Sequence, residues 1–331
     1  MTWAPALRLA GLAGLFGAVF TGSVLVGAGG VAVRDVPGAL LGSGDAQARI
    51  ILLELRVPRA ALASLVGGAL ALAGAVFQAV LRNPLAEPYV LGISGGAAVG
   101  AVAAVVLGWA AWSTWAIPLA AFVGALGAMG LVLQIAVAVS RSLDTRVLIL
   151  AGVVVGAFFN SAILLLLTFA DVESFRSAVF WMMGSLSGAD WTSVGVLAAY
   201  LAPAGVLLMA LGRPLNLLAV GEATARHLGT PVRRVRLLAY LATSLLVAAA
   251  VAVSGVIGFV GLIVPHAVRV VWGSNHRFLL PASVLAGASF LLVTDTLART
   301  VVAPSELPTG VVTALVGVPV FLLLLVRNWT E

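Results

Sequence analysis

Few residues of this 331-residue chain could do chemistry, because only 9% of them are charged and Cys is absent. His266 and Asp295 lie inside apolar runs, where ionisable groups often relay protons or hold ions. One His without a Cys or a nearby carboxylate makes a poor metal site, so we interpret His266 as structural. We expect Asp295 to be solvated or paired with Arg299, four residues further on. The sequence therefore predicts no catalytic residue, no metal site and no cofactor held by this chain.

Nucleotide chemistry would need a lysine that the chain lacks. All 18 basic residues are Arg, whereas a Walker A loop requires a Lys that reaches the β- and γ-phosphates of ATP. The Arg residues are scattered between apolar runs, so the net charge of +6 does not indicate a nucleic-acid partner. The chain is predicted to contain no ATPase and to bind no nucleic acid.

The longest hydrophilic stretch on the predicted inner side is 212–236, GRPLNLLAVGEATARHLGTPVRRVR. Its middle is predicted to be a short helix that starts near Glu222, carries Arg226 on one face and stops at Gly229. A simple helix connection needs fewer residues. The segment could anchor this side of the protein through its arginines, or it could dock a cytoplasmic partner. Its residues alone favour neither interpretation.

A second polar stretch, RNPLAEP at 82–88, separates two apolar runs. Pro84 and Pro88 prevent a continuous helix here. A turn accounts for the two prolines, but it does not require the polar Asn83 and Glu87 beside them.

Apolar runs position these polar stretches and set the fold class. The chain is 62% hydrophobic, and its mean hydropathy is +1.17. At about 20 apolar residues per crossing, it can hold roughly ten membrane helices. We predict an all-α membrane protein, a single transmembrane domain over residues 1–331. The expected spans are 8–28, 58–80, 90–108, 117–139, 147–169, 192–211, 237–256, 258–271, 278–297 and 308–326.

The first run is longer than the apolar core of a signal peptide, so we expect a retained helix. With the N-terminus inside, twelve Arg fall on the cytoplasmic side and six outside, as the positive-inside rule requires. This predicts a multi-pass protein of the bacterial inner membrane, embedded in lipid, with both termini cytoplasmic. Small residues at regular spacing allow close helix packing in lipid. We expect it at three glycine series, at 92–100, 11–17 and 255–261.

Five segments carry a resemblance that runs in order from about residue 50 to the C-terminus. They are RVPRAALASLVGGALALAGAVFQAVLRNPLAEPYVLGISGGAAVGA at 56–101, FWMMGSLSGADW at 180–191, GEATARHLG at 221–229, GFVGLIVPHAVR at 258–269 and ELPTGVVTALVGVPVFLLLL at 306–325. The chain resembles the FecCD/BtuC-type permeases of iron-siderophore, haem and vitamin B12 ABC importers. NPLAEP together with GFVGLIVPH is specific to that class.

The resemblance implies the BtuC-like type II ABC importer fold and an intertwined homodimer with its translocation path along the dimer axis. Two ATP-binding cassette ATPase subunits, which carry ATP and Mg, would bind below. A periplasmic or lipid-anchored substrate-binding protein would bind above. The missing Lys is then explained, because a separate chain hydrolyses ATP and this one is not an enzyme.

The resemblance also assigns site residues. It places ATPase coupling at Glu222, Ala225, Arg226, His227, Leu228 and Gly229. It implies docking of acidic residues of the binding protein at Arg56, Arg59 and Arg299. It places the cytoplasmic gate at Asn83, Leu85, Asp144 and Thr145. Segment 174–187 resembles a short helix at the outer mouth of the path. We expect Phe158, Phe159 and Asn160 to pack in the core rather than to line the path.

The alternative function is an ion-coupled secondary transporter. It would need carboxylates at mid-membrane, and the apolar spans contain almost none. The resemblance implies a ferric siderophore, cobalamin or haem as the cargo, ranked in that order. The sequence itself does not distinguish them, because in this family selection lies mainly in the separate binding protein.

Overall fold

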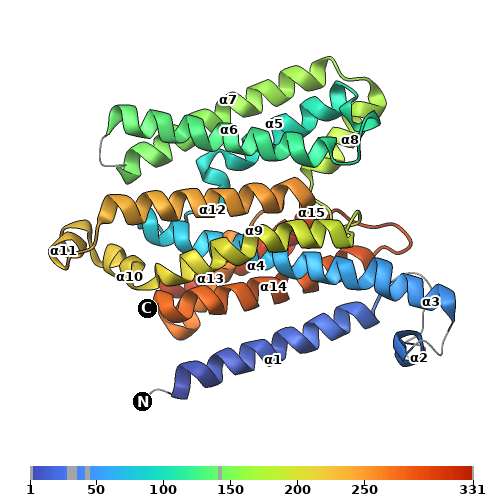
Figure 1. Cartoon of the computed structure of the whole chain (residues 1–331), viewed down its shortest axis with the longest axis horizontal. Helices are drawn as coiled ribbons and strands as arrows, with labels where there is room; N and C mark the ends of the chain where they lie inside the picture. The colour runs from blue at the N-terminus through green and yellow to red at the C-terminus, as the bar shows by residue number, and fades with distance from the viewer. Residues whose placement is uncertain (1–2, 28–35, 42–44, 141–143, 330–331) are drawn as a thin grey trace.

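The computed structural model describes residues 3–27, 36–41, 45–140 and 144–329. Over these ranges the chain is helical and forms no strand. Most of the helices run side by side along the long axis of the molecule (Figure 1). Residues 28–35 and 141–143 of the predicted loops lie outside the described ranges.

Seven helices of the described chain are long and apolar enough to cross a membrane. They are α1 (Trp3–Leu25), α4 (Val57–Val80), α6 (Ala116–Val139), α7 (Thr145–Thr168), α9 (Trp191–Ala210), α12 (Val232–Ser254) and α14 (His276–Thr300). Three further apolar helices are α5 (Ile93–Val106), α13 (Val260–Trp272) and α15 (Thr309–Trp329). Each matches one predicted span, so the prediction of an all-α membrane protein with about ten apolar helices is confirmed.

The remaining helices lie towards the ends of the bundle. They are α2 (Val36–Leu41), α3 (Ala46–Ile50), α8 (Val172–Met182), α10 (Gly212–Val220) and α11 (Glu222–His227). The helix expected within 174–187 is α8. Segment 212–236 holds α10 and α11 as well as the start of α12, and the prediction had included only the equivalent of α11. Helix α1 begins and α15 ends at the end of the bundle that carries α10 and α11 (Figure 1).

Helix α4 forms the centre of the bundle and packs against α9, α12, α13 and α14. Glycines bring these helices into backbone contact. A Cβ on Gly74 would lie 1.8 Å from the Gly261 carbonyl oxygen, and one on Gly67 would lie 2.3 Å from the Gly287 carbonyl oxygen. Such approach is available only to residues without a side chain.

The predicted glycine series differ in outcome. In the series 92–100, a Cβ on Gly96 would meet the Gly124 carbonyl oxygen at 2.3 Å, and one on Gly100 would meet that of Ala120 at 2.0 Å. Helix α5 therefore packs closely on α6, as expected. The series 255–261 also makes close contacts at both ends. The series 11–17 was wrongly predicted to pack, since a Cβ at any of its glycines would find nothing within 4 Å.

Helices α5 and α13 both begin inside the bundle. With 14 and 13 residues, each is about 20 Å long, short of the roughly 30 Å hydrocarbon core of a bilayer. The turn after α4 meets the break before α13: the Glu87 carboxylate accepts a hydrogen bond of 2.6 Å from the Phe259 N–H, and the Tyr89 hydroxyl donates to the Ile257 carbonyl. This contact explains the polar Glu87 that a simple turn did not require.

Candidate functional site

The end of the bundle that carries α10 and α11 presents a polar, exposed corner. Glu222 begins α11, and its carboxylate accepts from Arg226 at 2.5 Å and from Arg236 on α12 at 3.2 Å. Burial favours the neutral acid, but the guanidinium groups of Arg236 and Arg226 outweigh it and hold the pKa of Glu222 below its usual value. Because Arg236 is buried, Glu222 ties the exposed helix α11 to the interior of the bundle.

Most of the predicted coupling residues face outward. Arg226, His227, Leu228 and Gly229 are exposed, and the apolar Leu228 side chain is 63% exposed. Ala225 is different: it is fully buried and its side chain packs inward. The predicted part of Ala225 in ATPase coupling stays a prediction, and only its place in the backbone of α11 supports it.

The predicted gate residues lie next to this corner. Asp144 caps α7 by accepting from the Arg146 N–H at 2.8 Å. The Asn83 side chain accepts from the Leu85 N–H at 2.9 Å, and Leu85 is exposed. One pocket of about 670 Å³ joins the two sets, lined by Leu81, Arg82, Asp144, Thr145, Arg146, Ile149 and Glu222. Asp144, Thr145 and Glu222 are thus brought together, while Asn83 and Leu85 follow Arg82 in the adjoining turn.

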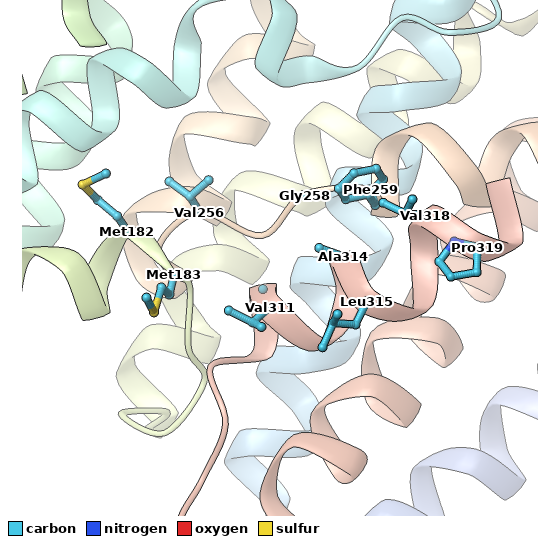
Figure 2. A pocket seen from close by; sticks show the side chains of 11 residues that line it. Met182, Met183, Val256, Gly258, Phe259, Val311, Ala314, Leu315, Val318 and Pro319 are labelled. Atoms are coloured by element: carbon cyan, nitrogen blue, oxygen red, sulfur yellow. The ribbon is translucent and has the colours of Figure 1, made fainter. Parts of the chain in front are cut away.

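An apolar pocket of about 610 Å³ lies where three elements meet (Figure 2). Met182 and Met183 come from the end of α8, Val256, Gly258 and Phe259 from the break before α13, and the rest from α15. Among the described residues no charged side chain lines it. Beyond it α15 exposes further apolar side chains, including Leu323, at 72%. This surface can face lipid, a second helix bundle or a bulky apolar molecule.

Helix α7 corrects one expectation. Phe158 is 64% exposed and Asn160 is also exposed, so neither packs in the core. Only Phe159 is partly buried, against α5 at Gly95. A polar amide that faces hydrocarbon is unfavourable. The exposed Asn160 therefore indicates that this part of α7 faces protein or water rather than lipid tails.

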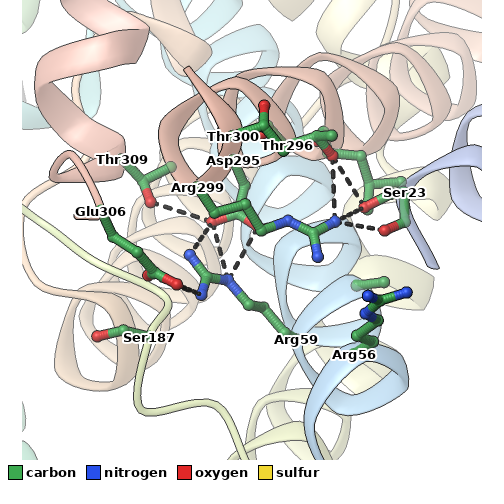
Figure 3. A network of polar contacts seen from close by, with 12 residues as sticks. Ser23, Arg56, Arg59, Ser187, Asp295, Thr296, Arg299, Thr300, Glu306 and Thr309 are labelled. Atoms are coloured by element: carbon green, nitrogen blue, oxygen red, sulfur yellow. Dashed lines mark hydrogen bonds and ion pairs between the residues drawn. The ribbon is translucent and has the colours of Figure 1, made fainter. Parts of the chain in front are cut away.

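The opposite end of the bundle holds a buried cluster of charges, which we call the arginine network: Arg56, Arg59, Arg299, Asp295 and Glu306 (Figure 3). Arg59 binds Asp295 through three hydrogen bonds of 2.9–3.2 Å and Glu306 through two of 2.9 and 3.0 Å. Arg299 lies 3.7 Å from Asp295 and also donates to Ser23 on α1. The expected pairing of Asp295 with Arg299 is confirmed, and Asp295 is buried rather than solvated.

Arg56 completes the network from the last turn of a π-helical stretch, Ile51–Arg56, that leads into α4. Its guanidinium donates to the carbonyl oxygens of Val24, Leu25 and Gly27 at 2.9–3.2 Å. The three predicted docking arginines are therefore buried and bonded within the chain. They still reach one pocket of about 190 Å³, lined also by Ile51, Leu55, Ser187, Ala189 and Glu306. Their docking role stays a prediction, and the structure gives them a first role in holding α1, α4 and α14 together.

His266 is buried, and its ring lies 6.1 Å from that of Phe321 in an edge-on contact, which fits a structural residue. Among the described residues no three His, Asp or Glu side chains gather into a metal site. Glu306 was not predicted as a site residue, although it stands out in the sequence as a lone acid before the last apolar run. Ser23 was not predicted either, because its role depends on the contact between α1 and α14.

Comparisons with known proteins agree with this arrangement. The model of the FecCD transport family matches residues 15–327. The vitamin B12 import system permease protein BtuC of Klebsiella pneumoniae is 44% identical over 284 residues, which cover 86% of this chain and 85% of that protein. The hemin transport system permease protein HmuU of Yersinia pestis is 40% identical over 280 residues, 84% of each chain. A solved inward-facing structure of a candidate metal-chelate type ABC transporter superposes with a TM-score of 0.88 at 32% identity, over 97% of this chain and 99% of that one.

Proposed function

This chain belongs to the FecCD transport family and is the permease subunit of an ABC importer, and on that premise we propose how it works with its partners. It forms a homodimer in the bacterial inner membrane, with both termini cytoplasmic. A separate ATPase pair binds at α11, and a substrate-binding protein docks at the arginine network. The cargo is a bulky metal chelate: a ferric siderophore, cobalamin or haem.

The observation that carries this proposal is the pocket shared by Glu222, Asp144 and Thr145. The predicted ATPase contact therefore lies beside the predicted gate. A displacement of α11 would act directly on the start of α7, because the two share the walls of one pocket. Glu222 also bonds buried Arg236 at 3.2 Å, which connects the same helix to α12. A partner that moves α11 would therefore act on both helices at once.

Two surfaces support the homodimer. The apolar pocket between α8, α13 and α15 is open, and no charged residue of the described ranges lines it, which suits a large ligand held weakly on its way through. The exposed Asn160 of α7 favours contact with a second copy or with water. A dimer that covers these surfaces would enclose a path between two copies.

Exposed Leu228 offers a direct test of ATPase binding. Replacing it by Asp puts a charge where an apolar side chain would enter a cleft of the ATPase, so co-purification of the ATPase should fall by more than tenfold. Leu107 supplies the control: it is 57% exposed and directly follows the last residue of α5. The variant Leu107→Asp should retain the ATPase. Equal retention by both variants would contradict the assigned surface.

The function itself is tested in liposomes that contain the permease and its ATPase. Uptake of the chelate should require ATP, the ATPase and the binding protein. Uptake that proceeds equally well without ATP would contradict the proposal and would favour ion-coupled transport instead.

A further inference from the structure

The arginine network borders an open pocket. Among the described residues it brings together the guanidinium groups of Arg56, Arg59 and Arg299 and the carboxylates of Asp295 and Glu306. The pocket of about 190 Å³ between these side chains, Ser187 and Ala189 is open at this end of the bundle. A guanidinium binds carboxylates through paired hydrogen bonds, so a carboxylate that enters this pocket can bind Arg59.

The two carboxylates already present are held very differently. Asp295 is 1% exposed and accepts bonds from Arg59 and from the Thr309 hydroxyl, with Arg299 beside it. Glu306 lies in the connection between α14 and α15, and its side chain is 37% exposed. Within the described part of the chain the Glu306 carboxylate bonds Arg59 alone, at 2.9 and 3.0 Å. Asp295 is thus a fixed partner of Arg59, and Glu306 is a replaceable one.

We propose that Glu306 is an internal competitor for the docking site: it covers the accessible side of Arg59 until a carboxylate of the substrate-binding protein takes its place. This inference rests on the proposed docking role of the arginines. In this exchange Arg59 gives up the Glu306 carboxylate and binds a carboxylate of the binding protein. Arg59 therefore stays paired, and no buried charge is left without a partner. It also frees the connection that leads within three residues to Thr309, the first residue of α15.

The ion pair of Glu306 with Arg59 is partly exposed, and such pairs contribute little free energy. Removing the Glu306 charge should therefore tighten docking of the binding protein by only about two- to fivefold. Glu306→Gln removes the charge and keeps the size. Glu54→Gln is the matched control, because Glu54 is an exposed acid in the π-helical stretch that precedes Arg56. It removes the same charge near the same surface without touching Arg59.

The experiment uses the full transporter in nanodiscs and the binding protein that stimulates its ATP hydrolysis. Binding is measured by biolayer interferometry at low salt. Glu306→Gln should bind more tightly than wild type, and Glu54→Gln should change affinity by less. Equal changes in the two variants, or weaker binding by Glu306→Gln, would overturn the exchange. Arg59→Gln separates the two proposals: if it docks like wild type, the docking role itself fails, whereas weak docking by Arg59→Gln with no effect of Glu306→Gln defeats only the exchange.

A second measurement follows the connection itself. The chain has no Cys, so Ser305→Cys provides a single site for a spin label beside Glu306. Saturating binding protein should increase the mobility of this label, because Glu306 leaves Arg59. A spectrum that is unchanged or more restricted would count against the exchange even if the affinities behave as expected.

Discussion

The pair of Arg59 and Asp295 yields a quantitative prediction about stability. Arg59 gives three hydrogen bonds to Asp295, which is 1% exposed. Removing one partner of a buried ion pair leaves the other charge without compensation, at a cost of about 3–5 kcal/mol. We therefore expect Arg59→Met and Asp295→Leu each to lower the free energy of unfolding by about 3 kcal/mol or more.

The double variant should behave differently from the sum of its parts. Arg59→Met with Asp295→Leu removes both charges and fills the space with apolar side chains, so its cost should stay near 2 kcal/mol or below. Independent effects would instead add to about 6 kcal/mol. Unfolding by SDS in mixed micelles, followed by the fluorescence of the eight Trp residues, measures all three variants. Single losses below about 1 kcal/mol, or a double variant that equals the sum, would refute a strongly coupled buried pair.

Three further predictions concern other parts of the chain. Gly74→Val should prevent stable folding because its Cβ would lie 1.8 Å from the Gly261 carbonyl oxygen, whereas Gly127→Val, with nothing within 4 Å, should fold normally in a fluorescence-detected gel-filtration assay. The lowered pKa of Glu222 means that its contribution is complete above the ordinary Glu value of about 4.3 and is lost as the pH falls through the lower folded value. The protection of the α11 amides, expressed relative to their intrinsic exchange rate, should therefore fall on acidification in wild type, and Glu222→Gln should show that low protection at every pH; an acid response that persists in the variant would exclude Glu222. Asp144→Ala removes the cap of α7 and should cost about 1 kcal/mol; no change in the SDS midpoint would contradict that role.

The positions of the membrane helices could be predicted because apolar runs and polar interruptions determine them locally. The segment 221–229 was also predictable as a short helix, since Glu222 and Gly229 mark its ends. The partners of Glu87 could not be found in this way, because Phe259 lies 172 residues further along the chain. A carboxylate that caps another helix looks, in sequence, like one that faces water.

The arginine network shows the same limit in another form. Resemblance suggested that Arg56, Arg59 and Arg299 face a partner, yet they are bonded to α1, Asp295 and Glu306. Of the ion pairs in the network, only that of Asp295 with Arg299 joins residues close in sequence, and only this pairing was expected. The prediction for helix α7 was wrong in the opposite sense, because a residue expected to be buried is exposed. The aromatic Phe158 suggested a core residue, but the helix face on which it lies is uncovered in a single chain.

The short length of helices α5 and α13 has a consequence for how the protein is inserted into the membrane. Segments of 14 and 13 apolar residues fall below the roughly 17–25 residues with which a nascent helix partitions into the bilayer by itself. Helices α5 and α13 must then enter the membrane with the help of sequences already there, and α4, complete before either of them is synthesised and in contact with α13, is placed to receive the second. Biogenesis of this permease thus depends on order of synthesis: the central helix has to be in the bilayer before the short segments can leave the insertion machinery.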